Sequence, residues 1–127
     1  MNRTALFAAL LFATCAISPS GAQTTTNYVH VQDVVYGHKL GVALTLDVFR
    51  PQKPNGAGII YAVSGGWFSN HSAIKAARYQ TYLDRGYTVF AVVHGSQPKF
   101  IIPEIYEDMH RAVRFIRHNA AQYGVDP

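Results

Sequence analysis

The sequence predicts an α/β protein with a mixed sheet, in which an antiparallel hairpin leads into parallel strands joined through a helix. Two β-branched and aromatic runs, 31–36 and 43–49, flank a short segment with two glycines, a pattern typical of a hairpin. Two continuous apolar runs, 59–63 and 87–93, follow with a helix-length segment between them. Because strands covered on both faces are apolar throughout, this second pair predicts parallel strands joined by a crossover.

The second run of the hairpin has its own internal pattern. Apolar residues in 43–49 alternate with Thr45 and Asp47, which favours an antiparallel strand with one wetter face. Pro51, Pro54 and Gly56 then interrupt the pattern, so the strand is expected to end there.

Two helices are expected around the parallel strands. The first covers about 72–85 and is closed by Gly86. The second is opened by Pro103, carries acidic residues near its start and arginines further along, and stops before Gly124, which agrees with the helix dipole. Its apolar residues recur at helical spacing and are Ile105, Met109, Ala112, Val113 and Ile116. Its charges are interpreted as a solvated face.

The first 22 residues have the features of a secretory signal peptide. A basic start precedes an apolar run over 5–17, and small residues lead to an expected cut between Ala22 and Gln23. The apolar run is too short to span a bilayer as a helix. A lipoprotein with its lipid on Cys15 is disfavoured, because the apolar run continues past that residue. We therefore expect a secreted or periplasmic mature domain over 23–127 without a stable membrane anchor.

Composition excludes several classes of function. Removal of 22 of the 127 residues leaves 105 and takes away Arg3, so the formal charge falls from +4 to +3. Scattered basic residues argue against a nucleic-acid partner. Cys15, the one cysteine, leaves with the signal peptide, so stability must come from an apolar core. The six histidines show no metal-ligand spacing, and we expect no metal site and no cofactor.

Chemistry is concentrated at the segment 63–67, Val-Ser-Gly-Gly-Trp, where an apolar strand ends and the chain turns toward a helix. Open α/β sheets bind ligands at the carboxyl ends of their strands. The pair Gly65 and Gly66 allows backbone N–H groups to approach a substrate oxygen without obstruction by side chains. In acyl transfer such donors stabilise the developing oxyanion.

With this loop in place, the region 34–127 resembles the α/β-hydrolase superfamily, in the esterase branches with a His-Gly-Gly-Gly-Trp loop, namely the hormone-sensitive-lipase-like and bacterial feruloyl-esterase-like groups. The resemblance implies that Gly65 and Gly66 donate the oxyanion-hole N–H groups. The chain departs from the pattern at Val63 and Ser64, which replace His and the first Gly, and at 94–96, where His-Gly-Ser replaces Asn-Tyr-Arg. The matching pieces are 46–51, 85–89, 103–104, 107–108, 111–117 and 123–127.

The resemblance implies a carboxylic-ester hydrolase of the serine-esterase type, acting on a small-molecule or polysaccharide-linked ester. Family members place the Gly-x-Ser-x-Gly nucleophile elbow, the acid and the histidine further along the chain, after a Gly-x-Asp-Pro segment that matches 124–127. We therefore expect an N-terminal part of an α/β-hydrolase domain that is truncated before the elbow and inactive alone. Two alternatives are a prolyl-oligopeptidase-like serine peptidase and a non-catalytic exported binding domain.

A different interpretation of the same loop makes Ser64 the nucleophile of an Ala-x-Ser-x-Gly elbow. The order serine, acid, base would then require Asp108 with His110 or His118. These residues lie on the expected second helix, which covers the sheet. The interpretation is disfavoured on that geometry, and Ser64 is expected to serve the hydrogen bonding of the loop.

Three further residues are weighed as site residues. His94 follows the strand 87–93 at the same end of the sheet as the loop, so it contacts substrate or is a polar residue that ends a strand. Trp67, with the neighbouring Phe68, either contacts substrate or packs beneath the loop, and packing is favoured. His71 is expected at the surface without a role.

Overall fold

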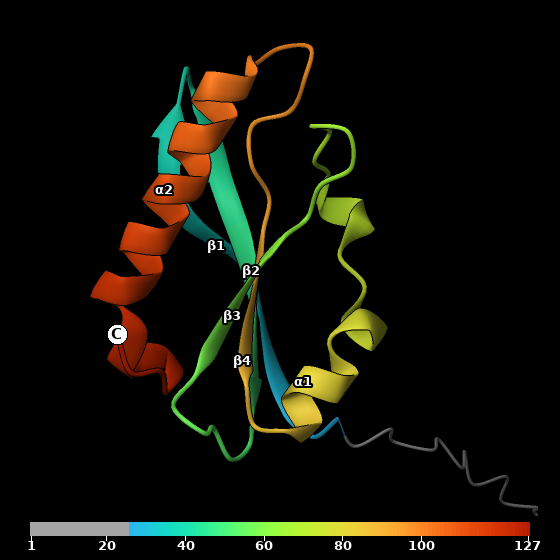
Figure 1. Ribbon diagram of the computed structural model, residues 1–127, viewed down its shortest axis with the longest axis vertical. Helices are drawn as coiled ribbons and strands as arrows, with labels where there is room; N and C mark the ends of the chain where they lie inside the picture. The colour runs from blue at the N-terminus through green and yellow to red at the C-terminus, as the bar shows by residue number, and fades with distance from the viewer. Residues whose placement is uncertain (1–25) are drawn as a thin grey trace, which may run out of the picture.

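The structure is a computed structural model that describes residues 26–127, so the predicted signal peptide and its cleavage site lie outside the described residues. Four strands form one sheet in the order β1-β2-β4-β3 (Figure 1). Strand β2 pairs antiparallel with β1 and with β4, and β3 pairs parallel with β4. The predicted mixed sheet is therefore confirmed. The strands are β1 (Tyr28–Lys39), β2 (Val42–Pro51), β3 (Gly58–Ala62) and β4 (Thr88–Val92).

Helical segments cover both faces of this sheet (Figure 1). Helix α2 (Ile102–His118) lies on one face, and α1 (Gln80–Asp84) lies on the other with the turns that precede it. None of the described helices is long and apolar enough to cross a membrane. The other helical segments within residues 26–127 are three short 3-10 turns, His71–Ala73, Ala76–Arg78 and Ala120–Tyr123.

The predicted hairpin is confirmed, with longer strands than the sequence indicated. Its turn consists of Leu40 and Gly41, both with positive φ, 46° and 76°, between the paired residues Lys39 and Val42. Positive φ at both turn residues matches the twist of the flanking strands, which is why two residues suffice. The predicted wetter face of β2 is wrong: Asp47 and Phe49 are buried, 1% and 0% exposed, because α1 and its turns cover that face.

The central strand β4 is buried along its whole length, as its continuous apolar sequence predicted. Phe90 and Val92 belong to an apolar cluster on the α2 face, whereas Val89 and Ala91 belong to the cluster on the other face. Successive side chains of a strand point to opposite faces, so one apolar strand contributes to two cores.

The helix predicted over 72–85 is wrong for most of its length. The chain forms two 3-10 turns, an extended break at Ile74 and Lys75, and only then the single short helix α1. Tertiary contacts override local helical propensity here. His71 is held at 2.9 Å from Asp47, and Ile74, Ala76 and Tyr79 pack into the same apolar cluster, which spreads the segment across the sheet.

Helix α2 begins one residue before the predicted Pro103, after a capping interaction in which the Ile101 N–H donates to the Glu104 carboxylate at 2.9 Å. Its buried positions include Ile105, Ala112 and Ile116, as their helical spacing predicted. Asp108 is also buried, although its charge had suggested the solvated face.

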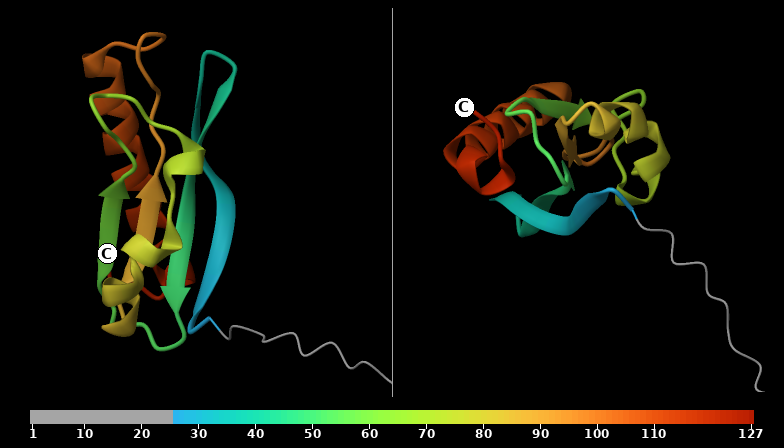
Figure 2. Two further views of the ribbon diagram at one scale, coloured as in Figure 1. Left: turned by 90° about the vertical axis from the view of Figure 1, so that its right-hand side faces the viewer. Right: turned by 90° about the horizontal axis from the view of Figure 1, so that it is seen from below.

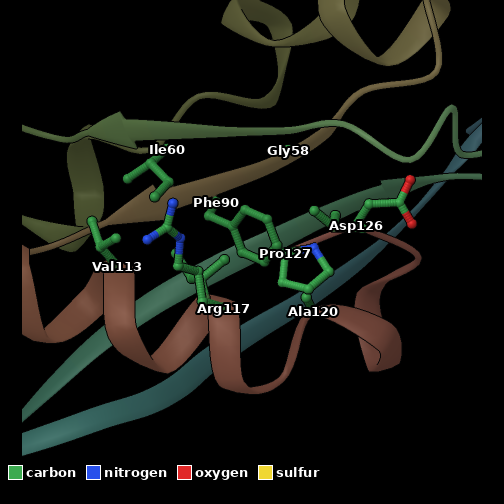
Figure 3. Close-up of a pocket in the computed structure, with 10 residues that line it drawn as sticks. Gly58, Ile60, Phe90, Val113, Arg117, Ala120, Asp126 and Pro127 are labelled. Carbon is green, nitrogen blue, oxygen red and sulfur yellow. The ribbon is translucent and has the colours of Figure 1, made fainter.

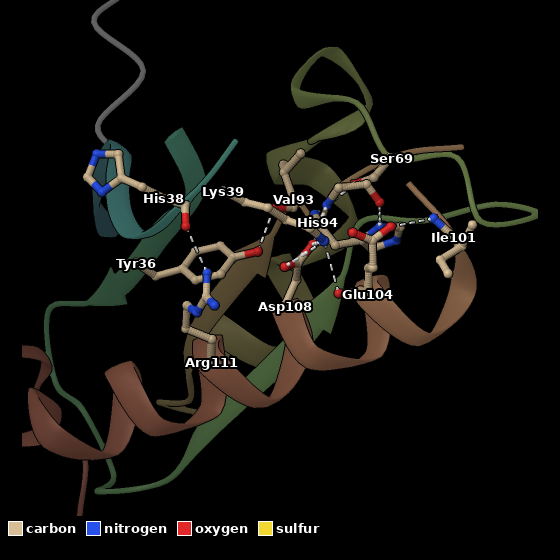
Figure 4. Close-up of polar contacts among 11 residues, drawn as sticks. Tyr36, His38, Lys39, Ser69, Val93, His94, Ile101, Glu104, Asp108 and Arg111 are labelled. Atoms are coloured by element: carbon tan, nitrogen blue, oxygen red, sulfur yellow. Dashed lines mark hydrogen bonds and ion pairs between the residues drawn. The ribbon is translucent and has the colours of Figure 1, made fainter. Parts of the chain in front are cut away.

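A buried ion pair between Asp108 of α2 and Lys39 of β1 connects the helix to the sheet (Figure 4). Its carboxylate is 1% exposed and lies 3.1 Å from Nζ of Lys39, and it also accepts the N–H of Gly95 at 3.0 Å. Beside it the hydroxyl of Tyr36 donates to the carbonyl of Val93 at 2.9 Å. Burial, assisted by the negative charge of Asp108, raises the pKa of Tyr36 well above its ordinary value, so this hydroxyl stays a donor.

The buried ion pair between Lys39 and Asp108 is expected to contribute to the free energy of unfolding. Lys39→Met should destabilise the fold by about 3–5 kcal/mol, because it leaves the carboxylate of Asp108 buried without a counter-charge. Chemical denaturation of both proteins, followed by circular dichroism, measures the difference. The double variant Lys39→Met/Asp108→Leu should recover much of the loss, and a double variant as unstable as the single one would contradict this account.

Strand β3 forms an edge of the sheet (Figure 2). Ile60 in its middle is 37% exposed. Beside it lies a hollow of about 250 Å³ between the strand and the end of α2, lined by Ile60, Phe90, Val113 and Arg117 among others (Figure 3). An open edge with unpaired backbone groups is a surface on which another strand can pair.

We therefore expect the chain to associate through β3. Light scattering at increasing protein concentration should show dimers or larger species, since open apolar edges recruit other chains. Ile60→Lys, which places a charge at the edge, should shift the protein toward monomer, whereas Val35→Lys, at an exposed position on β1, should not. A monomer at every concentration would count against the open edge.

Candidate oxyanion loop

The loop after β3 is tied to the loop after β4 by polar contacts. Val63 is buried, and its N–H donates to the carbonyl of Val92 at 2.9 Å. The hydroxyl of Ser69 donates to the carbonyl of Val63 at 2.6 Å and accepts the N–H of His94 at 3.2 Å. The Ser69 N–H in turn donates to Ser96 Oγ at 3.1 Å. Both ends of the loop are thereby fixed at the carboxyl ends of the parallel strands.

The tip of the loop is a second two-residue hairpin. Gly65 and Phe68 exchange both backbone hydrogen bonds, 2.9 Å for the Gly65 N–H and 3.0 Å for the Phe68 N–H. Gly66 and Trp67 between them have φ values of 57° and 68°. Two successive positive φ values define the tight turn that a reciprocal pair requires. Glycine accepts this conformation without strain, whereas Trp67 adopts it at a cost.

The two predicted oxyanion donors differ in this conformation. The N–H of Gly65 is engaged with the carbonyl of Phe68, whereas the N–H of Gly66 donates to no acceptor within 26–127. The N–H of Gly66 is therefore unengaged within the described residues, and its role as an oxyanion donor stays a prediction. Gly65 becomes available only when its bond to Phe68 opens.

Trp67 and Phe68 do not pack beneath the loop, so that part of the sequence analysis is wrong. They are 46% and 58% exposed, because the tight turn directs this part of the chain outward. Trp67 lines an open hollow of about 460 Å³ together with Ile102, Pro103 and Tyr106 at the start of α2. Substrate contact by Trp67 stays a prediction.

His94 lies directly beyond β4 at the loop end of the sheet, as predicted, but its side chain is 5% exposed. Its Nδ1 is 2.7 Å from the carbonyl of Gly95 (Figure 4), and the residue lines a hollow of about 370 Å³ with Thr45 and Phe100. Among the described residues no carboxylate contacts its ring, so His94 has no partner of the kind that orients a general base. Substrate contact by His94 stays a prediction as well.

The alternative triad around Ser64 is not assembled in the described part of the chain. Asp108 is bound by Lys39 and by the backbone of Gly95, and its hydrogen bonds include neither His110 nor His118. A triad needs the acid and the base in contact, so the geometry disfavours Ser64 as nucleophile.

Sequence reasoning missed one polar cluster altogether, that of His30, Asp33, Asp47 and His71. His71, expected at the surface without a role, lies with its Nε2 2.9 Å from the buried carboxylate of Asp47, and His30 approaches the same carboxylate at 2.7 Å. The members come from β1, β2 and a turn, so no spacing along the sequence could have indicated them. Asp47, the one acidic residue of β2, was the only signal.

The order of strands, the parallel pair β3–β4 and the glycine turn at their carboxyl ends agree with a segment of the α/β-hydrolase fold. A family model described as BD-FAE matches residues 46–127, more than half of the chain. The chain belongs to the BD-FAE family, which confirms the resemblance to α/β-hydrolase esterases.

Solved structures agree with this assignment. A truncated form of a carbohydrate esterase from gut microbiota is 30% identical with a TM-score of 0.67, over 80% of this chain and 37% of that one. The native thermophilic esterase Est2 from the Planctomycetes species Thermogutta terrifontis is 25% identical with a TM-score of 0.66. The match covers 75% of this chain and 36% of that one. Esterase B from Lactobacillus rhamnosis shares the fold, at 20% identity and a TM-score of 0.65. The match covers 79% of this chain and 33% of that one.

The matched part makes up only about a third of each of these three esterases. No curated protein matches the chain.

The loop geometry predicts different tolerances at its two glycines. Gly66→Ala should destabilise the chain by about 1–2 kcal/mol, because an L-residue is strained at φ 57°. Gly65→Ala should be nearly neutral, since its φ is ordinary and a Cβ there meets no atom within 4 Å. Thermal melts of the two variants, run side by side, measure this. Equal losses would show that the loop does not hold the described turn.

Proposed function

We propose that this chain is the N-terminal part of an exported carboxylic-ester hydrolase that works by a serine-esterase mechanism. The observation that carries the proposal is the free N–H of Gly66, held at the carboxyl ends of the parallel strands in a chain of the BD-FAE family. The matched part is only about a third of each matched esterase, and this, with the uncovered edge of β3, supports a larger domain around this segment. The sequence pattern of residues 1–22 supports export.

The role of the loop follows from where charge develops during ester cleavage. A serine hydroxyl from outside this segment attacks the acyl carbon, and the carbonyl oxygen takes up negative charge. The N–H of Gly66 donates to that oxygen, joined by Gly65 when the bond to Phe68 opens. A fixed donor stabilises this charge without reorganising during the reaction. The contacts of Ser69 with Val63 and His94 supply the fixed position.

The proposed substrate is a small-molecule or polysaccharide-linked ester. The name of the solved carbohydrate esterase supports the second class. Trp67 beside its open hollow offers an exposed aromatic surface at the mouth of the loop, suited to packing against an acyl group or a sugar ring.

Two reagents test the mechanism. The chain of residues 23–127 should neither hydrolyse a nitrophenyl ester above background nor be labelled by a fluorophosphonate. The longer protein that contains it should do both, with the label on a serine outside this segment. In that protein Gly66→Val should lower kcat about 100- to 1,000-fold with little change in KM, since the lost donor acts on the transition state.

Ser64→Ala is the matched control in the same loop and should keep most of the activity. Stoichiometric labelling of residues 23–127 at Ser64, or loss of acylation in Ser64→Ala with normal turnover in Gly66→Val, would overturn the proposal in favour of Ser64 as nucleophile.

A further inference from the structure

Two carboxylates in the described part of the chain are almost completely buried, and their surroundings differ. Asp108 and Asp47 are each 1% exposed. Asp108 has a lysine counter-charge at 3.1 Å. Asp47 forms no ion pair with lysine or arginine anywhere in 26–127, and its side-chain partners are the imidazoles of His30 and His71. A buried carboxylate without a fixed cation is costly unless something else neutralises it.

A second carboxylate is brought to the same place by an irregularity in β1. The pairing of β1 with β2 shifts between Val31 and Val34, and Asp33 within this bulge has a φ of 55°. Its backbone N–H donates to Oδ1 of Asp47 at 3.1 Å, while its own Oδ1 lies 3.1 Å from Nε2 of His71. Two acidic groups therefore approach one imidazole nitrogen, which raises the negative charge of the cluster.

We propose that Asp33, Asp47 and His71 bind a divalent transition-metal ion of the zinc type. One carboxylate oxygen from each aspartate and Nε2 of His71 lie within 4.8 Å of one another. Zinc binds nitrogen and oxygen ligands at about 2.0–2.2 Å in tetrahedral geometry, which places neighbouring ligand atoms about 3.4 Å apart. The His71 nitrogen is 2.9 Å from Asp47 and 3.1 Å from Asp33, so each of these two pairs separates by only a few tenths of an ångström to admit the ion.

The donor set selects this class of ion. An imidazole with two carboxylates suits zinc and similar first-row ions, whereas calcium and magnesium prefer oxygen ligands alone. Two carboxylate charges balance a divalent cation. The side chain of Asp33 is 71% exposed, so an ion can enter from solvent and water can complete its coordination. The ring proton of His71 then resides on Nδ1, which frees the Nε2 lone pair.

His30 serves as a positioning residue for this site. Its Nε2 lies 2.7 Å from Oδ2 of Asp47, the oxygen that does not face His71, and its ring stacks on Phe49 with centroids 4.0 Å apart. The contact orients the carboxylate so that Oδ1 points at His71 and Asp33. Partners that fix a ligand in this way commonly tune metal affinity.

A bound ion would join the hairpin to the segment that follows the oxyanion loop. His71 is in the first turn after that loop, two residues beyond Ser69, which ties the loop to the end of β4. The site is thus expected to stabilise the fold and the exit of the loop together, without contacting substrate. It stands independently of the proposed ester hydrolysis.

Zinc titration of the chelator-treated chain tests the site. We expect saturable binding of one ion per chain, a rise in melting temperature with zinc because the ion binds the folded state, and visible absorption bands of a tetrahedral site when cobalt replaces zinc. Asp33→Asn should weaken binding at least about tenfold while preserving the fold, because Asp33 is exposed and asparagine tolerates positive φ.

The controls separate this site from adventitious binding. His71→Gln should abolish the cobalt bands, and His110→Gln, an exposed histidine on α2, should leave affinity and bands unchanged. If His71→Gln fails to fold, the zinc affinity of Asp33→Asn still tests whether the ion binds at this site. The proposal would be overturned by an absence of saturable binding, by binding that Asp33→Asn leaves unaltered, or by binding that is lost in His110→Gln. An absence of saturable binding would mean that the N–H groups of the imidazoles alone stabilise the buried carboxylate of Asp47.

Discussion

Everything else in the fold depends on strand β4. It pairs antiparallel with β2 and parallel with β3, and it is buried from Thr88 to Val92. It joins the hairpin to β3, the strand that leads into the proposed oxyanion loop. A hairpin alone is marginally stable and needs further elements packed against it. Side chains on the two faces of β4 belong to the two apolar clusters, so α2 and the segment around α1 pack on opposite sides of the same five residues.

The parallel pairing of β3 with β4 also fixes the position of the proposed oxyanion loop. Carboxyl ends of parallel strands meet at one edge, and here the loops that follow them are bound to each other through Ser69. Backbone donors need such support, because an N–H group stabilises a developing charge only when its direction is fixed beforehand. The departures from the family pattern at Val63 and Ser64 leave this support intact, since the loop is held through backbone groups and the hydroxyl of Ser69.

Two buried aspartates illustrate two ways of placing a carboxylate in a small core. Asp108 is neutralised by Lys39, which draws the end of β1 onto α2. The carboxylate of Asp47 contacts the imidazoles of His30 and His71, and His71 also contacts the carboxylate of Asp33. These contacts hold the turn at His71 against the hairpin. Each is therefore a tertiary contact between elements distant in sequence. A polar group buried without its partner would oppose folding, so both contacts help specify this arrangement of elements.

The sequence by itself determined the fold class, the hairpin, the apolar central strand and helix α2, because period-2 and period-3.6 patterns report which faces are covered. It also located the glycine turn at 65–66, since that chemistry is contiguous in the chain. Only the tertiary structure decided that the segment 72–85 is broken, that Asp47 is buried, and that the N–H of Gly66 is free while that of Gly65 is engaged. The first two outcomes rest on contacts between residues far apart in the chain, such as His71 with Asp47, and local propensity carries no information about such contacts.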